Sequence, residues 1–283
     1  YGTLARVQGT GWTTEVNGSP WNLHAVAGTS VSDVWAVGMG GTIKHWNGSA
    51  WSTVPSGTTN WLSGVWAATP TDAWAVGVGD LRHWNGASWV KELTGLTSVG
   101  GATSVFGLSA TDVWAVGKGG SAIHWNGSAW SLEATATSSW LTGVWGATST
   151  DVWAVGTAGA ILHWNGNVWS PTPSGTTQWL RGVWGSTASD VWAVGDEGVV
   201  LRWNGAAWSQ VSSAPGERLR GITGTSAQDI WVVGGSAGPT RWNGSSWRTQ
   251  SAERIPLLIS VWSATPGRVW AVGAGAAVLA WTP

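Results

Sequence analysis

The sequence predicts an all-β fold, a seven-bladed β-propeller made of four-stranded antiparallel blades. First, a motif of Val, Ala or Ile, then Trp, then Ala/Val-Val-Gly occurs seven times, about 39 residues apart. Second, each repeat holds four short segments rich in Val, Ile and Trp, separated by Gly, Asn, Ser and Thr and without a helical period. Third, the last repeat lacks its outer strand, and the first residues of the chain match that missing part of the repeat.

The four expected strands follow one another in every repeat. In the fourth repeat they cover residues 141–145, 151–156, 160–165 and 168–172. Asn-Gly between the third and fourth segments, at 165–166, favours a tight hairpin turn. The dipeptide recurs at 47, 85, 126, 204 and 243, which supports the same turn in other blades.

The chain ends predict how the ring closes. The last repeat stops after its third strand, and residues 2–12 align without gaps on residues 41–51 of the first repeat. We therefore expect one domain over residues 1–283, with the last blade completed by roughly residues 1–16, since this pairing removes two exposed edges. Residues 2–7 and 276–281 compete for one third-strand position, and the sequence leaves the choice open.

Most of the 29 tryptophans are expected to be structural, because 25 of them fall on four repeated positions. In one repeat these positions are Trp145, Trp153, Trp164 and Trp169. If Trp153 faces Trp164 across a two-residue hairpin at residues 158–159, all four line one face of the blade. Small residues such as Val152 would then fill the other face, against which the next blade packs its tryptophans.

Repeated Asp and His residues give no metal or catalytic site. The Asp that opens the second strand, such as Asp151, is expected to bond turn amides. The histidines occupy one repeat position on four different blades, replaced elsewhere by Arg202 and Arg241, so they cannot form a single metal centre. We expect no metal, no cofactor and no catalytic residues. The single tyrosine is Tyr1, and no nucleophile motif or paired acid and base is present.

Composition excludes several partners. Only 10% of residues are charged and the net charge is −1, which argues against nucleic acid and anionic membranes. No apolar run is long enough to insert into a membrane. There is no cysteine, so disulfides cannot indicate the compartment. A secreted or cell-surface location is the expectation, and an oligomeric state is left open.

Four tryptophans outside the repeated positions are the candidate ligand-binding residues. Trp21, Trp61, Trp140 and Trp179 lie where one blade crosses to the next, at positions that other blades fill with Gly101, Arg218 or Leu257. Blade packing therefore does not demand Trp there. The predicted site also includes the polar residues Asn60, Gln178, Arg181 and His24. An aromatic ring beside such groups suits a sugar or a methylated ammonium group. In the alternative interpretation, these rings plug grooves between blades.

The repeat resembles the bacterial Asp-box (BNR-like) propellers, including the photosystem II stability and assembly factor group. The resemblance rests on the pattern L-x-G-V-W, D-V-W-A-V-G and H-W-N-G-x-x-W, although Asn-Gly replaces the Asp box. Lectin propellers of the tectonin and tachylectin groups are similar only in architecture and Trp content. We therefore expect a multivalent lectin for glycans, with methylated or otherwise apolar sugars as one option. The alternative, which the assembly-factor resemblance implies, is a protein-interaction scaffold without sugar binding.

Overall fold

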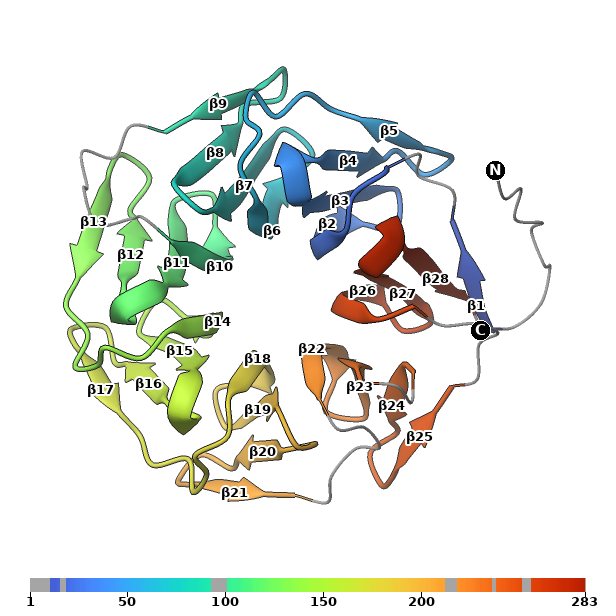
Figure 1. Ribbon diagram of the computed structural model, residues 1–283. Coiled ribbons are helices and arrows are strands. Elements are labelled where there is room, and N and C mark those ends of the chain that lie inside the picture. Colours follow the sequence, from blue (N-terminus) through green and yellow to red (C-terminus); the bar gives the residue numbers. More distant parts are fainter. Residues whose placement is uncertain are drawn as a thin grey trace.

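Seven four-stranded antiparallel sheets form a closed ring around a central axis, as predicted (Figure 1). This computed structural model describes residues 11–15, 19–92, 101–211, 218–235, 238–250 and 256–282. Blades 1 to 6 each consist of four consecutive strands from β2 to β25, and blade 7 consists of β26, β27, β28 and β1.

The strands of the blades have nearly constant lengths. The innermost strands are β2 (Leu23–Ser30), β6 (Leu62–Thr69), β10 (Ala102–Ser109), β14 (Leu141–Thr148), β18 (Leu180–Thr187), β22 (Leu219–Ser226) and β26 (Leu258–Thr265). The second strands are β3 (Asp33–Gly38), β7 (Asp72–Gly77), β11 (Asp112–Gly117), β15 (Asp151–Gly156), β19 (Asp190–Gly195), β23 (Asp229–Gly234) and β27 (Arg268–Gly273).

The third and outer strands are shorter. The third strands are β4 (Ile43–Trp46), β8 (Asp80–Trp84), β12 (Ala122–Trp125), β16 (Ile161–Trp164), β20 (Val200–Trp203), β24 (Thr240–Trp242) and β28 (Val278–Thr282). The outer strands are β5 (Trp51–Thr53), β9 (Trp89–Lys91), β13 (Trp130–Glu133), β17 (Trp169–Pro171), β21 (Trp208–Gln210), β25 (Trp247–Thr249) and β1 (Gly11–Thr14). Single 3₁₀ turns η1 (Met39–Gly41), η2 (Lys118–Gly120), η3 (Thr157–Gly159) and η4 (Ala274–Ala276) join second to third strands.

The ring is closed by the N-terminal strand. β1 pairs antiparallel with β28, with Trp12 opposite Trp281, and the two lie side by side in Figure 1. Since β28 also pairs with β27, residues of β28 occupy the third-strand position of blade 7. Residues 2–7, the other candidate for this third-strand position, lie outside the described residues. The predicted closure is therefore confirmed.

One predicted strand register is wrong. Trp145 faces Trp153 and Trp164 faces Trp169, as expected, but Trp153 faces His163 instead of Trp164. Five residues, 156–160, separate the last paired positions, Val155 and Ile161; they include η3 and do not form a two-residue hairpin. A register that differs by one residue moves the side chain to the other face of the sheet. Trp153 and Trp164 therefore lie on opposite faces of blade 4.

As a result both faces of each blade carry tryptophan, and the expected packing of a large face on a small face is wrong. The Trp153 ring lies 4.9 Å from Trp203 and 5.3 Å from Trp208 of the next blade, edge-on to the latter. The same three-ring contact recurs at the other six interfaces between blades: Trp35–Trp84–Trp89, Trp74–Trp125–Trp130, Trp114–Trp164–Trp169, Trp192–Trp242–Trp247, Trp231–Trp281–Trp12 and Trp270–Trp46–Trp51. These triads hold neighbouring blades together.

The repeated Asp joins the second and third strands, a role that the sequence did not predict, and in blade 1 Asp33 also accepts a hydrogen bond from the backbone of Thr29. In blade 4 the Asp151 carboxylate lies 2.7 Å from Nε2 of His163, whose ring stacks on Trp153. In blade 5 Arg202 takes the place of the histidine, bonds Asp190 and lies over Trp192. The Asp, His or Arg, and Trp positions therefore form one connected structural unit in blades 1 to 6, whereas blade 7 has Arg268 and Ala280 at the Asp and His positions.

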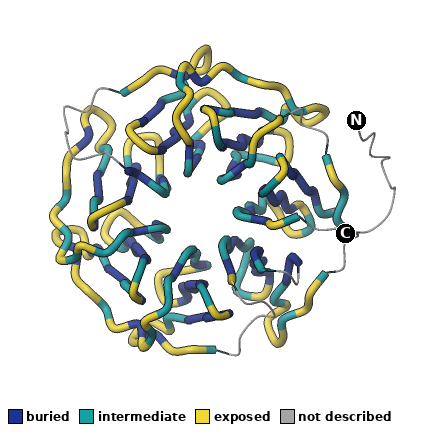
Figure 2. Tube along the Cα trace, in the orientation of Figure 1, coloured by how far each residue is buried: buried dark blue, intermediate teal, exposed yellow. Residues whose placement is uncertain are grey.

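The hydrophobic core runs between the blades. Buried residues concentrate on the inner three strands, and exposure rises toward the outer strands (Figure 2). Close packing next to the axis depends on glycine. The ring of Trp145 lies over Gly185 of blade 5, where an added Cβ would come within 2.5 Å of it. The innermost strands therefore leave little space for larger side chains.

Candidate functional site

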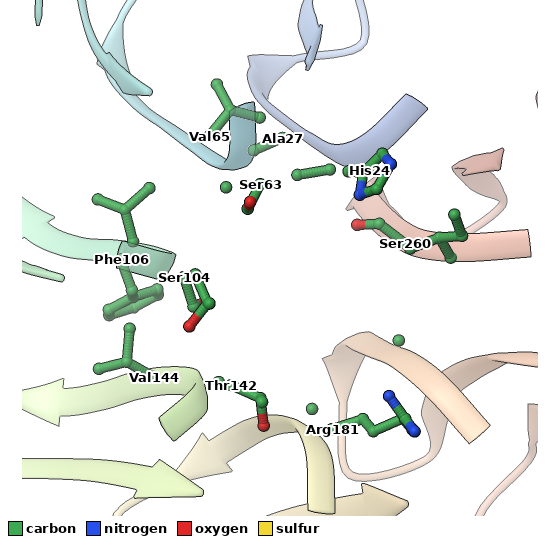
Figure 3. Close-up of a pocket in the computed structure, with 18 of the residues that line it drawn as sticks. His24, Ala27, Ser63, Val65, Ser104, Phe106, Thr142, Val144, Arg181 and Ser260 are labelled. Carbon is green, nitrogen blue, oxygen red and sulfur yellow. The ribbon is translucent and has the colours of Figure 1, made fainter. Parts of the chain in front are cut away.

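The innermost strands enclose a channel of about 650 Å³ along the ring axis. Figure 3 shows side chains from six blades around this axis, among them Ser63, Thr142 and Arg181. Toward the ends of these strands the channel is lined by Trp66, Phe106, Trp145, Trp184 and Trp262. Toward their starts it opens on the crossover face, the ring face where each outer strand leads to the next blade.

Three of the four candidate tryptophans meet at this opening. Trp61, Trp140 and Trp179 each directly precede an innermost strand and line the channel. Their backbone carbonyls accept hydrogen bonds from Val78, Thr157 and Asp196, in the connection between second and third strands of the same blade. This bond fixes the backbone at the rim. The Trp61 side chain is 49% exposed, and the Trp140 and Trp179 rings lie 5.5 Å apart.

Cationic side chains cover the Trp140 and Trp179 rings. The Lys118 ammonium lies 5.1 Å from the Trp140 centroid and the Arg181 guanidinium 4.0 Å from that of Trp179. The Lys118 stem passes over Gly101, where an added Cβ would lie 2.9 Å from it. Gly101 holds the place that tryptophan fills in neighbouring blades, so its missing side chain gives Lys118 room to reach Trp140.

An ion pair and a second arginine, Arg220, complete the cationic side of the opening. Arg181 binds both carboxylate oxygens of Asp196, Nη2 at 2.9 Å, and the hydrogen bond from Arg181 lowers the pKa of Asp196. Arg218 also approaches Asp196, at 3.3 Å. Arg220 lines the channel, and its buried Nε finds no acceptor among the described residues. Burial and the charges of Arg181 and Arg218 lower the pKa of Arg220.

The other side of the opening is neutral. His24 lines the channel with its ring 5.7 Å from Trp61, and burial together with the charge of Arg220 lowers its pKa. His24 is therefore uncharged at neutral pH. We name the opening formed by His24, Trp61, Lys118, Trp140, Trp179, Arg181 and Arg220 the channel mouth. It presents aromatic faces with positive charge concentrated toward blades 3 to 6.

The remaining candidates lie elsewhere. Trp21 and Asn60 line a separate groove over blade 1. The Asn60 side-chain amide donates to Asp80 at 2.6 Å, so it is occupied by an internal partner. Gln178 is half-buried, and its backbone N–H donates to Thr176; it does not line the channel. Of the predicted residues, the structure brings together Trp61, Trp140, Trp179, Arg181 and His24.

Sequence reasoning missed a buried polar network in blade 2. Asp80 is 3% exposed and accepts hydrogen bonds from Thr58, Asn60 and Arg82. Burial alone would raise the pKa of Asp80. The hydrogen bonds from Thr58, Asn60 and Arg82 outweigh that effect, and the pKa is lowered. The network fixes the loop that precedes Trp61. Its only signal in the sequence is the spacing between Trp74 and Trp84, ten residues instead of eleven.

Within the described ranges there is no group of three or more His, Asp or Glu side chains suited to a metal ion. The helical segments of the same ranges are all too short to cross a membrane. The histidines that recur on the third strands are paired with Asp, as in His45 with Asp33 at 2.6 Å.

No protein-family model matches the chain, and no curated protein matches it. Solved structures of similar fold include YCF48 bound to a D1 peptide, with a TM-score of 0.80, 14% identity, and coverage of 99% of this chain and 100% of that chain. YCF48 from Cyanidioschyzon merolae has a TM-score of 0.78, 15% identity and coverage of 96% and 99%. The WD40 β-propeller domain of Doa1 has a TM-score of 0.81, 14% identity and coverage of 96% and 97%. At these identities the likeness concerns the fold.

Proposed function

We propose that the chain is a protein-interaction scaffold whose channel mouth binds a peptide segment with acidic and apolar side chains. The observation that carries the proposal is convergence at one opening. Tryptophans from blades 2, 4 and 5 meet cations from blades 3, 5 and 6 there. Trp and Arg are the residue types that most often dominate protein–protein contacts.

The chemistry of the mouth fits such a segment. The buried Nε of Arg220 lacks an acceptor among the described residues, and a partner carboxylate would supply one in a charge-assisted bond. Trp61 offers a half-exposed aromatic surface to an aliphatic or aromatic side chain. The Lys118 and Arg181 cations already held over the neighbouring rings give the mouth a positive potential that attracts acidic segments.

The structural neighbours support a peptide partner. One of them, YCF48, shares the seven-bladed fold over the full chain and is described as bound to a D1 peptide. A rigid ring with a fixed opening loses little conformational freedom on binding, which favours its use as a scaffold. That the chain is not an enzyme stays a prediction.

The lectin interpretation has less support. It expected several similar sites around the ring, each with tryptophan beside free polar groups. Instead Trp61, Trp140 and Trp179 line a single opening, and two of these rings are covered by cations. The Asn60 amide, expected to bind sugar hydroxyls, donates to Asp80. Sugar binding is therefore the alternative result that the experiment below is designed to detect.

The test is selection of binding peptides from a library, followed by calorimetric titration of the selected peptides into the protein. We expect selected peptides to contain Asp or Glu near an apolar residue. Arg220→Met and Trp179→Ala should each weaken binding by about ten- to a hundredfold, since each removes a charge-assisted bond or a buried ring contact. Arg248→Met removes the same charge from exposed β25 and should leave binding unchanged.

Two results would overturn the proposal. One is that no peptide is selected while a glycan array gives sugars whose binding is lost in Trp61→Ala. The other is that selected peptides bind the Arg220→Met protein as tightly as the unaltered chain. Circular dichroism and the melting temperature of every variant establish that the ring remains folded.

A further inference from the structure

A buried lysine in blade 1 has no charged partner among the residues that the structure describes. Lys44 in β4 is 4% exposed, and its Nζ donates to Oγ1 of Thr53 at 2.6 Å. No carboxylate of the described ranges forms an ion pair with it. Burial lowers the pKa of Lys44. An ammonium group taken from water and given one neutral hydroxyl is costly to the fold.

The next blade shows how this chain otherwise accommodates a buried cation. Arg82 holds the same register position in blade 2, and its Nε lies 2.7 Å from Oδ1 of Asp80. Asp80 corresponds to Thr42 in blade 1, whose hydroxyl donates to the carbonyl of Met39. Blade 1 therefore has the cation without the internal carboxylate.

The other five blades have an uncharged residue at this position. These residues are Ile123, Leu162, Leu201, Thr240 and Leu279. The four aliphatic ones are buried members of the core. The blade architecture thus accepts an aliphatic side chain here, and packing does not require the charge of Lys44.

Lys44 lies in the wall of an open groove of about 770 Å³ on the crossover face. We call it the blade-1 groove; it is lined by residues 19–21, 40–44 and 53–60. Trp21 is 50% exposed and lies against the bare backbone of Gly40, where an added Cβ would be 3.4 Å from its indole. The groove therefore combines a flat aromatic surface with a buried positive charge.

An equivalent groove over blade 4 provides an internal comparison. Its volume is about 750 Å³, and it is lined by the matching loop with the same Pro-Ser-Gly-Thr-Thr sequence. There Ser139 stands in place of Trp21 and Leu162 in place of Lys44. The aromatic ring and the cation thus both line the groove of blade 1, and both are absent from the groove of blade 4.

We propose that the blade-1 groove binds an organic carboxylate with a flat apolar skeleton, the carboxylate pairing with Lys44 and the skeleton stacking on Trp21. The bound carboxylate would supply the counter-ion that Asp80 supplies in blade 2. A flat ring with C–H or aromatic faces fits an exposed indole. An aromatic acid and a uronic acid share this chemistry. The site is separate from the channel mouth and does not depend on the function proposed for it.

The test is ligand-observed NMR of the full chain with benzoate, glucuronate and neutral benzamide. We expect at least one of the two acids to bind and benzamide not to bind. Binding of benzoate identifies the aromatic acid class, and binding of glucuronate identifies the uronic acid class. Lys44→Leu should reduce acid binding at least tenfold, and Trp21→Ser should weaken it severalfold. Leu162 and Ser139 are the precedents in blade 4 that make both variants compatible with the fold.

Controls separate this site from the channel mouth. Ser139→Ala, in the blade-4 groove, should bind the acids as the unaltered chain does. Lys44→Leu should retain whatever peptide affinity the mouth shows, since Lys44 does not line the channel. The proposal is overturned if neither acid binds, if benzamide binds as well as the acids, or if folded Lys44→Leu binds them with unchanged affinity.

Discussion

Tryptophan has different roles in this protein according to its strand position. On the second strands it is enclosed, as for Trp153, which is 1% exposed between two rings of the next blade. At the residue before an innermost strand it stands at the rim, as for Trp61, which is 49% exposed. A buried aromatic ring contributes through area and edge-to-face contacts, whereas an exposed one contributes little to stability.

Replacement of single tryptophans should separate these roles. We expect Trp153→Ala to lower the free energy of unfolding by about 3–5 kcal/mol, because it leaves a cavity between blades. Trp61→Ala should change it by less than about 0.5 kcal/mol. Urea denaturation of both variants provides the measurement. A loss of stability for Trp153→Ala as small as that expected for Trp61→Ala would mean that the triads do not hold the blades together.

The Asp80 network predicts a pH effect. Because the pKa of Asp80 is lowered in the folded state, its contribution is complete above about pH 3.9 and is lost as the pH falls below that value. Asp80→Asn should lower the free energy of unfolding at pH 7 by about 2–4 kcal/mol, since Arg82 loses its counter-ion. It should also lose less stability than the unaltered chain between about pH 4 and 2. Denaturant titrations at each pH measure the free energy of unfolding of both proteins. If it changes with pH by the same amount in Asp80→Asn and in the unaltered chain, the role given to Asp80 is contradicted.

At the scale of the strand, connection length decides what the sequence could and could not predict. The number of strands, their order and two of the three Trp pairings followed from spacing and turn residues, because these depend on local patterns. The pairing of Trp153 with His163 did not, because the same Gly-containing segment can form a two-residue or a five-residue connection. That single difference reverses the face of every third-strand residue.

The contact of Trp145 with Gly185 gives a test between neighbouring strands. Gly185→Ala places a Cβ within about 2.5 Å of the Trp145 ring, and overpacking of this kind costs about 1–3 kcal/mol. Phe106 occupies the matching place in blade 3, and the three atoms nearest to a Cβ added at the corresponding Gly146 of blade 4 belong to Val152, Asp151 and Leu108. Trp145→Phe should therefore relieve most of the loss in the double variant. Thermodynamic cycles on the melting transitions measure the coupling, and additive effects would contradict the packing.

At the scale of the whole molecule, the ring closes because Trp12 completes the seventh triad with Trp231 and Trp281. The complementary chain ends made this closure predictable. The channel mouth was predictable only in part. Trp61, Trp140 and Trp179 stood out because blade packing does not require them. That they share one opening depends on the ring. That the Nε of Arg220 lacks an acceptor among the described residues depends on side-chain packing, which residue spacing does not reveal.

Closure can be tested against an internal standard. Trp12 and Trp247 are both half-buried and hold the same outer-strand position in blades 7 and 6. If β1 seals the ring, Trp12→Ala and Trp247→Ala should lower the free energy of unfolding by similar amounts, about 2–3 kcal/mol. Chemical denaturation compares them directly. An unchanged stability for Trp12→Ala alone would mean that β1 does not close the ring.

The central claim is that one partner-binding site lies at the channel mouth on the crossover face. Photo-crosslinking from two matched positions tests it most directly. Val78 lines the channel and Val168 lies in a turn on the opposite ring face, and each is 47% exposed. With benzoylphenylalanine at either position and a selected acidic peptide present, we expect crosslinks from position 78 and none from position 168. Crosslinks from position 168 alone, or equally from both, would contradict a site at the channel mouth.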